Sequence, residues 1–111
     1  MSNKLEHKGF IGSVEFSSDD NLFFGKIEGI NDLILFEGST VDELKSSFEF
    51  MVNEHIKDCK LEKKPLLKSF RGNFNVRTST ELHQVAYFKA IRKGISLNKL
   101  VNEAIKSYVA L

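Results

Sequence analysis

The chain has 111 residues, of which 41% are hydrophobic and 28% are charged, and its formal net charge is +1. This length suits one compact domain or two very small ones, and the composition is ordinary for a globular protein. The single cysteine excludes an intrachain disulfide, and no apolar run is long enough for a signal peptide or a membrane helix. We therefore expect a cytoplasmic protein.

The small net charge conceals a division along the chain. Residues 1–59 hold 5 Lys against 12 Asp and Glu, a net charge of −7, whereas residues 60–111 hold 8 Lys and 3 Arg against 3 Glu, a net charge of +8. This segregation predicts two modules, a basic one for nucleic acid and an acidic one for a basic partner. A chance division of solvated surface charge is the alternative interpretation.

The first part of the chain predicts three strands and a helix. Residues 10–17 alternate in polarity, and the turn cluster at 18–21 predicts a hairpin with residues 22–28. A second turn leads to a short apolar run at 33–36, the third strand. The helix is expected over 41–59, so this part predicts an antiparallel sheet covered by one helix.

The start of this helix carries a capping box, in which Thr40 and Glu43 are three residues apart. The helix is expected to end after Cys59, because the next residues are highly charged and lead to Pro65. Apolar residues recur at steps of three and four and predict one buried stripe. The stripe comprises Val41, Leu44, Phe48, Met51, Val52, His55, Ile56 and Cys59.

The second and third strands are apolar on both faces. Alternation places Leu22 and Phe24 opposite Phe23 and Ile27 in the second strand, and Leu33 and Leu35 opposite Ile34 and Phe36 in the third. One helix covers only one face, so the other is expected to meet a second copy of the chain or a different partner. Covering by the linker or by the C-terminal module is the alternative.

Residues 60–72 are expected to form a linker, because they lack periodicity and contain the only proline. The following residues, 73–78, alternate in polarity and predict a short strand. A lone strand cannot satisfy its own backbone hydrogen bonds, and the same strand of a second chain is a suitable partner.

Two helices are predicted after this strand. Thr78 and Glu81 form a second capping box that starts a helix over 79–93, Gly94 ends it, and Ser96 caps the last helix. Their apolar positions are Leu82, Val85, Ala86, Phe88 and Ile91 in the first helix, and Leu97, Leu100, Val101, Ala104, Ile105 and Tyr108 in the second. A strand and two short helices make a core only when doubled, which predicts a homodimer; association of dimers into a tetramer stays open.

The alternation within 73–78 defines a candidate DNA-binding surface. Phe74, Val76 and Thr78 fall on the inner face, and Asn73, Asn75 and Arg77 on the outer one. Two such strands form a ribbon that fits the DNA major groove, where asparagine pairs with adenine and arginine with guanine. An edge strand with ordinary polar exposure is the alternative.

A candidate phosphate site follows at the start of the last helix. The backbone amides near Ser96, Leu97 and Asn98 lie at the positive end of this helix and suit an anion. Lys99 and the linker lysines would add affinity that depends on salt and not on sequence.

The C-terminal part of the chain resembles the ribbon-helix-helix repressors of the Arc and MetJ type. The resemblance lies in the strand with Phe74 to Arg77, the helix after it, the run Gly94 to Asn98 and the last helix. The resemblance implies that Asn73, Asn75 and Arg77 contact bases, and that the segment from Ser96 to Asn98 holds a backbone phosphate.

The chain further resembles HicB antitoxins in the segments 25–29 and 36–44 and in the linker that leads into Gly72 to Arg77. This family implies an α+β fold, with a partial ribonuclease-H-like domain over residues 1–59 and the ribbon-helix-helix domain over 73–111. The first domain would bind and block a small basic HicA-type toxin that cleaves mRNA, and the second would bind operator DNA and repress the operon.

The sequence does not predict catalysis. The carboxylates of a ribonuclease-H-like centre would be Glu15, Asp19, Asp20 and Glu28, but turns and strand ends separate them. His55 and Cys59 have a spacing compatible with a metal pair, yet both fall on the buried stripe without a third ligand. We expect a binding protein without metal or cofactor. The alternative function is a stand-alone ribbon-helix-helix repressor whose N-terminal domain senses a small molecule.

Overall fold

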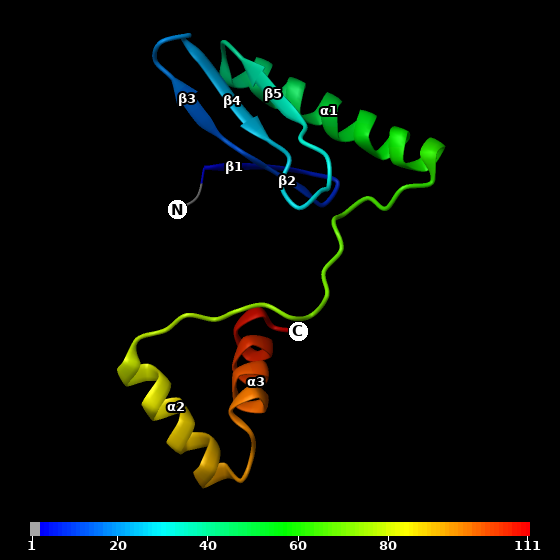
Figure 1. Ribbon diagram of the computed structural model, residues 1–111. Helices are drawn as coiled ribbons and strands as arrows, with labels where there is room; N and C mark the ends of the chain where they lie inside the picture. Colours follow the sequence, from blue (N-terminus) through cyan, green and yellow to red (C-terminus); the bar gives the residue numbers. More distant parts are fainter. Residues whose placement is uncertain (1–2) are drawn as a thin grey trace. The chain divides into compact units, whose positions relative to one another are not determined.

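The computed structural model describes residues 3–111, which form two compact units, one ending at Arg71 and the other spanning Gly72–Leu111 (Figure 1). The first unit contains strands and one long helix, and the second contains two helices, so the predicted α+β class is confirmed. Among the described residues, no helix combines the length and the apolar character needed to cross a membrane.

Unit 1 contains two antiparallel sheets and helix α1. Strands β1 and β2 form one sheet, and β3, β4 and β5 form the other in that order. The bounds are β1 Lys4–His7, β2 Phe10–Ser13, β3 Glu15–Ser17, β4 Leu22–Lys26, β5 Leu35–Gly38 and α1 Val41–Glu62. The predicted hairpin of β3 with β4 and the predicted third strand are thus present, although β5 begins two residues later than expected.

The prediction of one continuous strand over residues 10–17 is wrong, because the chain leaves one sheet and enters the other at Val14. The Oγ of Ser13 accepts the backbone N–H of Lys26 at 3.0 Å. The carbonyl oxygen of Ser13 lies so close to Gly25 that a Cβ at this glycine would collide with it. Ser13, where the chain passes from one sheet to the other, is therefore in contact with the end of β4.

The sequence analysis did not predict strand β1. Its hairpin with β2 turns through Lys8 and Gly9, which both have positive φ, at 51° and 83°. Two positive φ values are characteristic of the type I′ turn, whose usual residues are Asn or Asp followed by Gly. Lysine at the first position gave no turn signal, so the strand before it was missed.

Helix α1 packs on one face of the three-stranded sheet. Six residues form the buried core: Phe10, Ile27, Phe36, Leu44, Phe48 and Val52. The rings of Phe36 and Phe48 lie 5.0 Å apart, and a Cβ at Gly12 would come within 2.8 Å of both rings. The predicted stripe of α1 is buried or half-buried except at Val41, which is exposed.

The predicted capping box at the start of α1 is confirmed, with the Glu43 N–H donated to Thr40 Oγ1 at 3.1 Å and the Thr40 N–H donated to Glu43 Oε2 at 3.2 Å. We expect Thr40→Ala to lower the free energy of unfolding by about 1 kcal/mol, because an orphan N–H of the helix loses its acceptor. Urea unfolding followed by circular dichroism measures this change. Ser39→Ala is the matched control, since the Ser39 hydroxyl makes no recorded hydrogen bond, and an equal loss in both variants would contradict the prediction.

Helix α1 extends to Glu62, three residues beyond its predicted end, and Lys63 ends it with φ of 55°. Part of the predicted linker then returns to unit 1. The Nε2 of His55 lies 2.9 Å from the carbonyl oxygen of Leu66, and the backbone N–H of Lys68 donates to Gly29 O at 2.9 Å. The Cys59 thiol lies 3.6 Å from the carbonyl oxygen of Pro65. These contacts explain why the first compact unit includes residues up to 71.

Unit 2 contains α2 (Thr80–Lys93) and α3 (Leu97–Val109). Both predicted caps are confirmed. Gly94 ends α2 with φ of 69°, and the Oγ of Ser96 accepts the Lys99 N–H at 3.0 Å at the start of α3. The capping box at Thr78 is wrong, because Ser79 is the N-cap and its Oγ accepts the Leu82 N–H at 3.1 Å.

Candidate interaction sites

Unit 2 buries little of its apolar surface by itself. Of residues 72–111 only Ala90 is buried, and Tyr108 is 92% exposed. The exposed large apolar side chains of α2 and α3 are Leu82, Val85, Tyr87, Phe88, Ile91, Ile105, Tyr108 and Val109. Apolar surface on this scale, in so small a unit, is typical of a surface that a partner covers.

The three predicted base-contacting side chains, Asn73, Asn75 and Arg77, are all exposed. Within the described single chain, residues 73–78 lie outside any strand. The inner-face residues Phe74 and Val76 are also exposed, at 70% and 56%. Pairing of this segment with a second copy, and the groove-facing role of the polar side chains, stay predictions.

The predicted phosphate site lies at the amino end of α3. Ser96 Oγ accepts the N–H of Lys99, which leaves the N–H groups of Leu97 and Asn98 without a recorded acceptor. Asn98 and Lys99 are exposed, and Leu97 is half-buried. The backbone donors and the positive end of the helix dipole therefore face solvent together, as an anion site requires.

The charge division persists, in reduced form, between the two compact units. Unit 1 has 9 Lys and 1 Arg against 13 Asp and Glu, a net charge of −3. Unit 2 has 4 Lys and 2 Arg against 2 Glu, a net charge of +4. The charge difference is smaller than the one calculated for residues 1–59 and 60–111, because five basic residues of the second range lie in 60–71 and belong to unit 1.

The second candidate site is the face of the three-stranded sheet that α1 does not cover, which we call the open sheet face. The register pairs Phe24 of β4 with Glu15 of β3 and with Glu37 of β5, so these three side chains share one face. Phe36, which packs on α1, occupies the other face. The predicted separation of Leu22 and Phe24 from Phe23 and Ile27, and of Leu35 from Phe36, is thus confirmed, and the register places Leu35 on the same face as Phe24.

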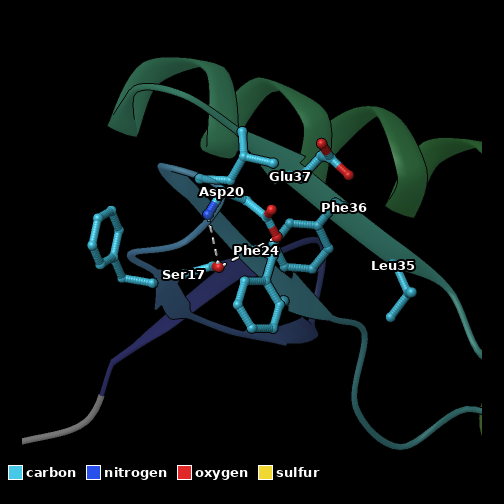
Figure 2. Close-up of a pocket in the computed structure, with 9 residues that line it drawn as sticks. Ser17, Asp20, Phe24, Leu35, Phe36 and Glu37 are labelled. Atoms are coloured by element: carbon cyan, nitrogen blue, oxygen red, sulfur yellow. Dashed lines mark hydrogen bonds between the residues drawn. The ribbon is translucent and has the colours of Figure 1, made fainter.

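A shallow hollow of about 460 Å³ lies on the open sheet face (Figure 2). Its lining comes from all three strands and from the turn between β3 and β4: Phe16, Ser17, Asp20, Leu22, Phe24, Gly25, Leu35, Phe36 and Glu37. Phe24 is 38% exposed and Leu35 is 59% exposed, so the face presents apolar carbon to solvent. The sequence analysis missed Glu37 as a member of this face, because it ended the strand at Phe36.

Acidic side chains border the hollow. Glu15 and Glu37 flank Phe24 across the strands, and the Asp20 carboxylate lies 3.4 Å from the Ser17 hydroxyl. Within residues 3–111, none of these carboxylates takes part in a salt bridge. The lysine on the same face, Lys26, lies 3.8 Å from Glu28, so its charge is partly balanced.

The sequence analysis considered four carboxylates for catalysis and the His55–Cys59 pair for metal binding, and the structure places the Cys59 thiol 3.6 Å from His55 Nε2. Among the described residues, no three His, Cys, Asp or Glu side chains are close enough to hold a metal ion. His55 and Cys59 are buried, as their place on the stripe predicted, and the ring of Phe10 packs against His55 at 5.5 Å. Nearby, hydrogen bonding to Glu62 raises the pKa of the exposed Lys64 ammonium.

These features define a two-unit protein with an acidic, partly apolar sheet face and a basic helical unit whose apolar side chains are exposed. Residues 55–105, slightly less than half of the chain, match the model of the HicB family. The match runs from the last turns of α1 through most of α3. Comparison with curated proteins and with solved structures finds no match.

Proposed function

We propose that the chain is the antitoxin of a HicA/HicB-type system, which binds a small basic mRNA-cleaving toxin through unit 1 and operator DNA through unit 2. The observation that carries this proposal is the HicB family match over residues 55–105. On this proposal the protein is not an enzyme. It acts in the cytoplasm, where toxin and operator are found.

The exposed apolar face of unit 2 supports the DNA-binding part of the proposal. Two copies would bury Phe74, Val76 and the apolar side chains of α2 and α3 against each other. The same pairing would turn Asn73, Asn75 and Arg77 outward on a two-stranded ribbon. The net charge of +4 on unit 2 favours approach to DNA.

Co-expression with the protein of the adjacent reading frame tests the toxin-binding part. We expect the two proteins to purify together, and the chain to relieve the growth arrest that the neighbouring protein causes alone. A neighbouring protein that neither arrests growth nor purifies with the chain would contradict the proposal.

The alternative, a repressor that senses a small molecule through unit 1, predicts an enclosed pocket in that unit. The hollow on the open sheet face is instead open to solvent and lined by residues of three strands. Small-molecule sites usually bury most of the ligand surface, so this geometry favours a protein partner.

A further inference from the structure

We infer that the open sheet face, centred on Leu22, Phe24 and Leu35, is the surface that binds the basic toxin, through an apolar patch bordered by Lys or Arg on that partner. This inference rests on the proposed antitoxin function and assigns the contact to particular residues. The hollow opens to solvent, spans three strands and lies among exposed apolar side chains, which suits a protein partner.

The apolar part of this face has no cover from residues 3–71, the described part of unit 1. Helix α1 packs on the opposite face, where Phe36 meets Phe48, and the returning segment contacts the end of α1 and Gly29. Phe24 and Leu35 lie on neighbouring strands beside the hollow (Figure 2). Phenylalanine is enriched at protein interfaces, so the exposed Phe24 is a suitable centre for one.

The charged border determines the chemistry of the partner. Glu15 and Glu37 lie on either side of Phe24, and Asp20 lies at the end of the hollow near Ser17. These carboxylates lie outside the salt bridges recorded for residues 3–111, so their charge is available to an incoming cation. Rim charges of this kind speed association with an oppositely charged surface and exclude like-charged proteins.

The test measures binding of the full-length chain to a catalytically inactive form of the HicA-type protein from the adjacent reading frame. We expect Leu35→Lys to weaken binding about 100-fold or more, because it places a cation in the centre of a face that meets a basic protein. Glu37→Lys changes only an exposed rim residue. We expect this variant to associate more slowly with the partner, and the salt dependence of the association rate to be partly reversed.

Phe50→Lys is the matched control, since Phe50 is 60% exposed on α1, in the layer on the other side of the sheet. This variant should bind as tightly as the wild type. Circular dichroism and melting temperature establish that each variant is folded; if Leu35→Lys does not fold, Glu37→Lys decides the result.

The outcomes separate this inference from the proposed function. If the wild type binds no neighbouring protein, the antitoxin function is wrong. If the wild type binds and the sheet variants bind equally well, the toxin contacts another surface and only the inference is overturned. If Leu35→Lys instead lowers the number of copies per particle without affecting toxin binding, the face is a contact between copies and the inference is likewise overturned.

Discussion

The double variant Asn75→Ala with Arg77→Ala is expected to lose discrimination between its own operator and unrelated DNA. On the proposed ribbon these side chains point to base edges, and a bidentate contact is worth about 1–3 kcal/mol of discrimination. Removal of both side chains should reduce the specificity ratio about 30-fold to 10⁴-fold. Both side chains are exposed in the single chain, so the substitutions should leave the fold of unit 2 unchanged.

The measurement compares binding to a duplex from the region upstream of the gene with binding to an unrelated duplex of equal length, at several salt concentrations. Lys99→Ala is the matched control, because a phosphate contact carries no sequence information. It should weaken binding to both duplexes alike and lower the slope of log K against log salt by about 0.9 for each phosphate that the lysine no longer neutralises. A double variant that still distinguishes the two duplexes would refute the assignment of the base-contacting residues.

The regular parts of unit 1 follow from its sequence. The spacing of Leu44, Phe48 and Val52 fixes the buried face of α1, and the side chains of Thr40 and Glu43 fix its start. Period-two alternation separates Phe24 from Phe23 and Leu35 from Phe36, which is sufficient to predict an uncovered apolar face.

The errors occur where tertiary contacts override local patterns. Residues 10–17 alternate as one strand, yet the contact of Ser13 with Gly25 and Lys26 divides them between two sheets. The end of α1 was placed too early, because the buried His55 and Cys59 hold the chain beyond the helix through backbone oxygens that sequence periodicity cannot show. Thr78 and Ser79 are both good N-caps, and the local sequence does not decide between them.

The segment 73–78 shows a different limit of prediction from one sequence, because its structure depends on a partner strand. Its alternation is clear in the sequence, but a strand exists only where another strand supplies hydrogen-bond partners. Within one copy of unit 2 the segment has no such neighbour, and Phe74 remains 70% exposed. The candidate DNA-binding residues can therefore be predicted from the sequence, whereas their geometry depends on a second chain.

Phe48→Ala should unfold most of unit 1, because Phe48 is 1% exposed and packs against Phe36 in the centre of the core. Truncation of a buried phenylalanine costs about 3–5 kcal/mol, and the core of a domain of fewer than about 70–80 residues rarely supplies more than about 3–5 kcal/mol. Phe50→Ala, two residues further along the same helix, removes a ring that is 60% exposed and should change the stability by less than about 0.5 kcal/mol. Urea unfolding followed by circular dichroism measures both changes.

The consequences of Phe48→Ala for function depend on whether the two units fold independently. Phe48 lies in the first compact unit, and the proposed DNA-binding residues lie in the second, after Arg71. We therefore expect this variant to lose toxin binding and to retain sequence-specific operator binding in a gel-shift assay. Loss of both activities at once would mean that unit 2 requires a folded unit 1, whereas retention of both would mean that unit 1 stays folded without the Phe48 ring. Selective loss would locate the toxin-binding activity in the unit that is built around Phe48, and would show that the helices of unit 2 fold without that unit.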